Sequence, residues 1–172
     1  MVRFHDFLPP GNSFLEDVLA GLAQPQKSIP PKYFYDERGC RLFEAICDLP
    51  EYYPTRTEIA IMRGNLAGMA PLYVPIDIAG DTLRAASSEL AALFPALNIT
   101  GLCADYSRPL ELPTFAASST KAPIRRIAAF FPGSTIGNFT PAAALEFLSR
   151  TRALVGRGGA LLIGVDLKKD KK

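Results

Sequence analysis

The sequence predicts an α/β fold in which helices cover a parallel sheet on both faces. The evidence is a set of short runs that are apolar on both faces, as strands buried between two helical layers are. The runs lie at residues 72–78, 99–103, 127–131 and 160–165. Helical patterns lie between the first two and between the last two, whereas the Pro-, Ser- and Thr-rich stretch 109–124 reads as a surface connection.

The ends of these two helices have sequence signals of their own. Asp81 is expected to cap the helix that carries Leu83, Leu90 and Leu93, and Pro95 to stop it. The later helix is expected to begin at Thr140, where a capping hydroxyl precedes a proline, and to end at Gly156. We therefore expect a sheet domain over residues 71–172.

Residues 1–70 predict an N-terminal helical segment that belongs to the same single domain. Three start signals divide it, and each precedes apolar residues at helical spacing. They are Ser13 with Glu16, the lone cap Asp36, and Thr55 with Glu58. The prolines of residues 24–32 predict an ordered loop or extended arm after the first helix.

Composition excludes several classes of protein. Of 172 residues, 48% are hydrophobic and 21% are charged, which is ordinary for a globular chain and unlike a disordered one. A net charge of +2 without a basic stripe argues against nucleic-acid binding. The longest apolar stretches fall short of the roughly 20 residues that span a bilayer, and the N-terminus lacks a signal-peptide centre. We expect a cytoplasmic protein that is monomeric if stable and acts on a small molecule.

The cysteines and the histidine predict no metal site. Cys40, Cys47 and Cys103 are odd in number and lie within apolar patterns, which favours reduced, buried thiols over a disulfide framework. The single histidine, His5, lies far from them in the sequence, so a zinc site would lack ligands.

Acidic residues follow the expected strands, at the edge where open parallel sheets bind ligands. Asp77, Asp105 and Asp166 stand at or just after three strand ends, and the turn 132–138 follows the remaining one. A carboxylate there matches the vicinal hydroxyls of a ribose, so the set favours a nucleoside-containing cofactor. For any single aspartate a cap of the following helix is the favoured explanation, so the prediction depends on the three occurring together.

The turn 132–138 joins two glycines and two hydroxyls to Asn138, whose carboxamide both donates and accepts hydrogen bonds. It suits an amino-acid ligand, although Asn138 also suits a purely structural turn. Tyr52 and Tyr53, beside prolines, are open to the same two interpretations: half-buried packing, or a phenol at the rim of a cleft.

Four long segments, in order, resemble the histidine-specific methyltransferases. They are KYFYDERG at 32–39, LPEYYPTRTE at 49–58, FFPGSTIGNF at 130–139 and LLIGVDLKKD at 161–170. The resemblance implies an incomplete Rossmann-like, class I methyltransferase fold. It also implies transfer of three methyl groups from S-adenosylmethionine to the α-amine of L-histidine, which gives hercynine in ergothioneine biosynthesis.

The resemblance also implies site residues. Tyr52 and Asn138 match the substrate-binding tyrosine and asparagine of the family. Asp77 matches the acid that binds the cofactor ribose, and Asp105 with Tyr106 the pair beside the adenine. Tyr35 is expected near the cofactor as well. No metal is implied.

The sequence departs from the family pattern in two places. Between residues 69 and 72 it lacks the strand and glycine-rich loop that wrap the methionine part of the cofactor, and it stops before the portion that completes the substrate pocket. The alternative to an active enzyme is therefore a non-catalytic fragment or isoform. A dinucleotide-binding oxidoreductase would share the fold pattern, but its glycine fingerprint is absent.

Overall fold

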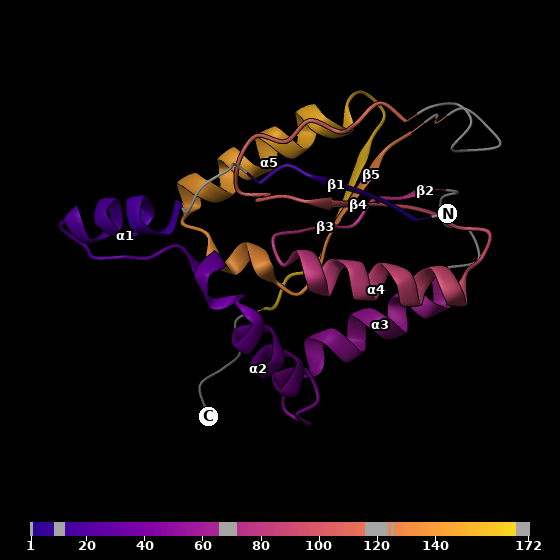
Figure 1. Ribbon diagram of the computed structural model, residues 1–172, viewed down its shortest axis with the longest axis horizontal. Coiled ribbons are helices and arrows are strands. Elements are labelled where there is room, and N and C mark those ends of the chain that lie inside the picture. The colour runs from indigo at the N-terminus through magenta and orange to yellow at the C-terminus, as the bar shows by residue number, and fades with distance from the viewer. Residues whose placement is uncertain (1, 9–12, 66–71, 116–123, 125, 168–172) are drawn as a thin grey trace. The chain divides into compact units, whose positions relative to one another are not determined.

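The computed structural model describes residues 2–8, 13–65, 72–115, 124 and 126–167. These residues divide into two compact units that alternate along the chain. Figure 1 labels their helices and strands. The first unit comprises Met1–Ala45 with Leu72–Arg108, and the second comprises Ile46–Pro71 with Pro109–Lys172. The predicted boundary near residue 70 stays a prediction.

The first unit is built on a parallel sheet with β4 (Asn98–Cys103) at its centre. One edge of β4 pairs with β1 (Val2–Asp6), and the other pairs with β2 (Leu72–Tyr73) and then β3 (Ile76–Asp77). The single strand expected over 72–78 is therefore two short ones, interrupted at a proline that has no N–H to donate. Because the partners are parallel, Asp77 and Cys103 end their strands side by side.

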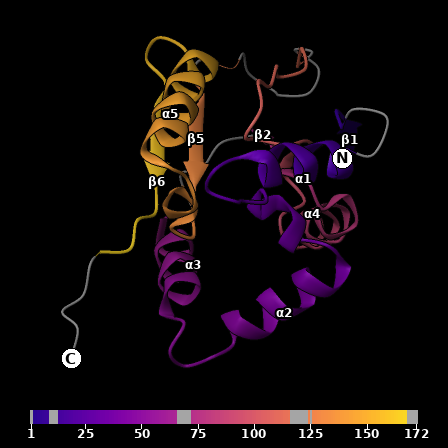
Figure 2. The ribbon, with the colours of Figure 1, turned by 90° about the vertical axis from the view of Figure 1, so that its left-hand side faces the viewer.

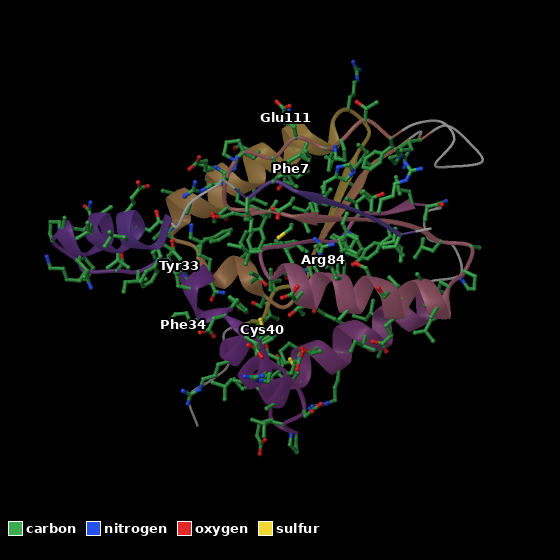
Figure 3. All side chains as sticks on the ribbon, viewed as in Figure 1. Phe7, Tyr33, Phe34, Cys40, Arg84 and Glu111 are labelled. Atoms are coloured by element: carbon green, nitrogen blue, oxygen red, sulfur yellow. The ribbon has the colours of Figure 1, made fainter. Side chains whose placement is uncertain are left out.

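The core of this unit lies between the sheet and α4 (Gly80–Leu93). Leu83 of the helix and Ile99 and Leu102 of β4 are buried, as their apolar spacing predicts. Gly101 lets β1 approach closely, since a Cβ there would lie 2.7 Å from the ring of Phe4. The guanidinium of Arg84, labelled in Figure 3, lies 4.8 Å from that ring and so connects helix and strand.

Three helical elements follow β1 in the sequence: α1 (Ser13–Ala23), the 3-10 turn η1 (Pro31–Phe34) and α2 (Glu37–Cys47). The predicted cap of α2 is confirmed, because Oδ1 of Asp36 accepts a hydrogen bond from the Gly39 N–H at 2.7 Å. The Ser13 side chain, part of the predicted cap of α1, lies outside the described residues.

The second unit contains the parallel pair β5 (Ala128–Phe131) and β6 (Ala160–Ile163), with α5 (Pro141–Val155) alongside (Figure 2). Both predicted ends of α5 are confirmed: the Thr140 side chain accepts from the Ala143 N–H, and Gly156 is the C-cap with φ 70°. The unit also contains α3 (Tyr53–Asn65) and the 3-10 turn η4 (Thr135–Asn138). Three phenylalanines pack together in it, with ring centroids 4.4 to 6.2 Å apart: Phe131, Phe139 and Phe147.

Three details of the sequence prediction are wrong. The segment expected to be helical also holds a strand, β1, whose five residues are too short a run to stand out without the distant partner β4. Asp81 does not cap α4; it lies inside the first turn, and the N-cap residue is Ala79. Thr55 and Glu58 form no capping box, because α3 already begins at Tyr53.

Candidate functional site

The predicted cofactor residues Tyr35, Asp77, Asp105 and Tyr106 all belong to the first unit. Three of them interact electrostatically with the fourth, Tyr106. Burial, together with the neighbouring Tyr35, Asp77 and Asp105, raises the pKa of Tyr106 to about 12. The phenol therefore stays neutral at physiological pH. Segments from η1, β3 and β4 thus converge at the carboxyl end of the sheet, where parallel sheets bind ligands.

Asp77, the last residue of β3, is exposed to solvent. Oδ1 of Asp77 accepts the Ala79 N–H at 2.8 Å, while its backbone carbonyl accepts from Ala104 at 3.0 Å. No described residue donates to Oδ2 of Asp77. The side chain thus has a fixed orientation and an exposed oxygen, which fits a carboxylate that accepts a ligand hydroxyl.

The aspartate after β4, by contrast, is engaged within the protein. Oδ1 of Asp105 accepts from the backbone N–H of Ser107 at 3.0 Å and from its hydroxyl at 2.5 Å. Oδ2 lies 3.1 Å from Nζ of Lys32 and 3.5 Å from Nε of Arg108. We call residues 104–108 the Asp105 loop. Both carboxylate oxygens serve to fix this loop and, with it, Tyr106.

Lys32 carries the same network to the N-terminal helices. Its Nζ lies 2.8 Å from Oδ2 of Asp17 on α1, and that oxygen also accepts from the hydroxyl of Tyr33 at 2.6 Å (Tyr33 is labelled in Figure 3). The Lys32 side chain is 16% exposed and that of Asp105 10%, so solvent screens their ion pair only in part. The segment 31–35, which contains η1 and Tyr35, is therefore connected to the loop after β4 that contains Tyr106.

These contacts change the acidity of the groups that make them. Hydrogen bonds from Lys32 and Tyr33 lower the pKa of Asp17. Burial opposes ionisation of Asp105, but the hydrogen bonds from Ser107 and Lys32 outweigh it and hold the pKa below its usual range. Burial likewise opposes the charge on Lys32, but its hydrogen bonds to the two carboxylates leave the pKa raised. All three groups are charged near neutral pH.

The thiol that precedes this loop is buried. Cys103 is 8% exposed, and its Sγ lies 3.7 Å from the carbonyl oxygen of Ile78. Burial raises the pKa of the thiol, and the neighbouring Asp6 raises it further. Cys40 and Cys47 are free thiols that are only partly buried. Among the described residues no cluster of three or more His, Cys, Asp or Glu side chains is arranged to hold a metal ion.

The predicted substrate residues Asn138 and Tyr52 belong to the second unit. Asn138 is the exposed last residue of the segment 132–138, which we call the Asn138 turn. Gly133 and Ser134 are both in the left-handed region, with φ of 73° and 56°. A serine there is strained and needs support from its surroundings. The hydroxyl of Ser134 gives some of it by accepting from the Asp166 N–H at 2.9 Å.

Arg56 holds the turn that presents Tyr52. Its Nη1 donates to the carbonyl of Leu49 at 2.7 Å and its Nη2 to that of Pro50 at 2.5 Å. The N–H of Tyr52 donates to the same Leu49 carbonyl at 3.1 Å. Tyr52 itself is partly buried. One guanidinium therefore fixes the backbone just before the tyrosine, which is a use of the planar arginine side chain that lysine cannot reproduce.

A cavity of about 170 Å³ lies beside the Asn138 turn. Its polar lining includes Glu58, Ser134, and the hydroxyl of Tyr53, which donates to Oδ1 of Asp166 at 2.5 Å. Of the adjacent tyrosines, Tyr53 thus faces this cavity, whereas sequence reasoning could not distinguish its role from that of Tyr52.

Comparison with known proteins identifies the family of this chain. The model of the histidine-specific, S-adenosylmethionine-dependent methyltransferases matches residues 14–72 and 66–172. The chain belongs to this family. The histidine N-alpha-methyltransferase of Mycolicibacterium smegmatis is 36% identical, and that of Mycobacterium tuberculosis 33%, each over 90% of this chain. Ergothioneine biosynthesis protein 1 of Neurospora crassa is 29% identical over 84% of this chain and 20% of its own length.

The chain spans about half the length of the mycobacterial relatives, 56% in each case. Those alignments run over 187 residues, more than the 172 residues of this chain, so the relatives carry internal residues that this methyltransferase-family chain lacks. The two segments matched by the family model overlap at residues 66–72, which is the place where the resemblance predicts the missing glycine-rich loop. No helix among the described residues is long and apolar enough to cross a membrane.

The residues that support the candidate site have a weaker signal in the sequence than the predicted site residues. Lys32 and Asp105 are 73 residues apart, and Glu58 and Gly133 are 75 apart. Each pair forms only when the chain folds, so no local pattern marks it. The sequence pattern marks Glu58 only as the second residue of a capping box with Thr55.

Proposed function

We propose that this chain binds S-adenosylmethionine at the carboxyl end of the first unit's sheet, as part of a methyltransferase that acts on the α-amine of L-histidine and forms hercynine. The names of its mycobacterial relatives support the acceptor. The observation that carries the cofactor assignment is the parallel pairing that ends β3 and β4 side by side, which brings Asp77 and the Asp105 loop with Tyr106 to one edge of the sheet.

The residues present fit the nucleoside part of that cofactor. The exposed carboxylate of Asp77 suits the ribose hydroxyls. Tyr106 offers a neutral aromatic side chain beside the adenine position, and Asp105 fixes the loop that carries it. The cofactor supplies the methyl group on a positively charged sulfur. The chain's own residues hold the nucleoside, and Tyr35 adds an aromatic ring near that positive charge.

Tyr52 and Asn138 are the proposed contacts of the acceptor. The carboxamide of Asn138 can donate to the carboxylate of an amino acid or accept from its amine. Methyl transfer to an amine requires a neutral nitrogen in line with the methyl–sulfur bond, so alignment of the acceptor is the main task of these residues.

A second candidate function is that of a non-catalytic member of the family. The specific observation in its favour is that the described strands form two separate sheets, one around β4 and one of β5 with β6. A chain without the glycine-rich loop would bind the methionine part of the cofactor poorly. We expect much weaker S-adenosylmethionine binding than in a full-length relative.

Calorimetric titration distinguishes the candidates. The full chain and a full-length mycobacterial relative are titrated with S-adenosylmethionine, and each is then incubated with cofactor and L-histidine for mass spectrometry. Micromolar binding with methylated histidine supports the enzyme and rejects the non-catalytic candidate. Asp77→Asn should weaken cofactor binding tenfold or more, whereas the control Asp81→Asn should not. Monomeric state and cytoplasmic location stay predictions.

A further inference from the structure

The carboxylate of Glu58 is directed at the start of the Asn138 turn. From α3, both of its oxygens lie 2.8 Å from the backbone nitrogen of Gly133, whose N–H donates to them. A hydrogen bond to a charged acceptor is about twice as strong as one between neutral groups. No described residue forms an ion pair with Glu58, so its charge is directed to a single backbone group.

A second glycine makes room for this carboxylate. A Cβ on Gly164, just after β6, would lie 1.9 Å from Oε1 of Glu58 and 3.3 Å from the nitrogen of Gly133. The Gly164 N–H donates to the carbonyl of Phe131 at 3.0 Å, which fixes its backbone beside the end of β5. Glu58 therefore occupies a space that the ends of both strands leave for it.

The group held in this way begins the left-handed pair Gly133 and Ser134. From Ser134 the chain continues directly into η4, where the Gly137 N–H donates to the Ser134 carbonyl at 2.9 Å. The Phe139 N–H donates to the Ile136 carbonyl at 3.1 Å and closes the turn. The left-handed serine is strained, so its conformation needs support from the residues around it. The orientation of Asn138 at the end of the turn therefore depends on the contact that holds Gly133.

We propose that Glu58 is a positioning residue: by holding the Gly133 N–H, it sets the Asn138 turn in the conformation that binds the acceptor amino acid. This inference rests on the proposed function for its ligand, and on the geometry alone for its effect on the turn. It replaces the capping role that the spacing of Thr55 and Glu58 predicts.

The test compares Glu58→Gln, which keeps an oxygen acceptor, with Glu58→Ala and Glu58→Met, which remove it. Glu51→Ala, a change to an exposed glutamate in the same unit, is the matched control. Amide hydrogen exchange of the full chain is followed at Gly137, at Phe139 and, as an internal reference in α5, at Ala144. Affinity for L-histidine is measured by calorimetry in the presence of S-adenosylhomocysteine.

We expect the Ala and Met variants to exchange at Gly137 and Phe139 at least tenfold faster and to bind L-histidine at least tenfold more weakly. Ala144 should be unchanged, and Glu58→Gln and Glu51→Ala should stay within threefold of the unmodified chain. Unchanged exchange at Gly137 and Phe139 in the Ala and Met variants would overturn the inference. If the unmodified chain binds no L-histidine, the proposed acceptor fails, while the exchange rates still decide whether Glu58 holds the turn.

Discussion

The Asp105 loop and the Asn138 turn both follow a parallel strand, but different forces hold them. In the first, charged side chains from three segments meet: Lys32 and Arg108 each pair with the loop's own Asp105 and with Asp17 of α1. In the second, one carboxylate holds a backbone N–H, and a glycine provides the space. The first arrangement should respond to pH and salt, and the second to steric changes.

The forces that hold each segment match the side chain that the segment presents to a ligand. The Asp105 loop presents the large neutral ring of Tyr106. Ion pairs between long side chains are sufficient to hold the loop that carries such a ring. The Asn138 turn presents a short exposed carboxamide, whose direction is set by the backbone itself. Control of the backbone at a left-handed glycine is the more direct means of aiming such a group.

The largest expected effect comes from crowding the turn. Gly164→Ala should lower the free energy of unfolding by about 3 kcal/mol, because the added methyl overlaps the Glu58 carboxylate and forces it away. Thermal and urea unfolding measure this. Gly137→Ala is the control, since its Cβ would meet nothing closer than 4.0 Å. Equal losses in the two variants would contradict the steric account.

A smaller loss of stability is expected when the ion pairs of the Asp105 loop are removed. Lys32→Met should cost about 2 kcal/mol, since it leaves two partly buried carboxylates with only the more exposed Arg108, at longer distances, as a shared partner. The exposed pair of Arg41 and Glu37 gives the matched control, and Arg41→Met should cost about 0.5 kcal/mol or less. Urea unfolding at neutral pH compares the two; a loss no greater than in the control would show that the network contributes little.

Acid should lower the stability of the first unit, because the same network depends on two ionised aspartates. The pKa values of Asp17 and Asp105 are lower in the folded chain than their ordinary 3.8, so folding is favoured above that value and the gain is lost as pH falls through the folded values. The free energy of unfolding should therefore fall below about pH 5. Lys32→Met should flatten this dependence, and an unchanged slope would argue against the network.

The smallest effect concerns Tyr106. Its pKa is raised to about 12 in the folded chain, so its neutral form favours folding below pH 10 and this contribution is lost as pH rises toward 12. Tyr106→Phe should leave the pH dependence of unfolding unchanged between pH 6 and about 9. Phenolate absorbance should show one fewer tyrosine titrating at the highest pH.

Local patterns were sufficient for part of the fold. The apolar run of β4, the Thr140 cap and Gly156 at the end of α5, and the Asp36 cap of α2 depend on near neighbours, and the structure has each of them. The strand β1 does not stand out in the sequence because VRFHD is a run of only five residues and its partner is about a hundred residues away. Pairings of that kind are decided by the folded chain.

The same division holds for the candidate site. The strand-end aspartates were visible in sequence because the edge of a parallel sheet is a general binding location. Which aspartate is exposed and which is engaged was not visible, since Asp105 meets Lys32 only after the arm folds against the strand end. The roles of Tyr52, Asn138, Tyr35, Asp77, Asp105 and Tyr106 stay predictions.

The buried thiol of Cys103 gives the first unit a natural reporter. A thiol reagent can react with it only when the end of β4 opens, because the group is enclosed and its thiolate is disfavoured. Its labelling rate, measured beside the faster partly buried Cys40 and Cys47, would follow the local opening of the segment that leads to Tyr106. A ligand that closes this strand end would slow that labelling without any tag on the chain.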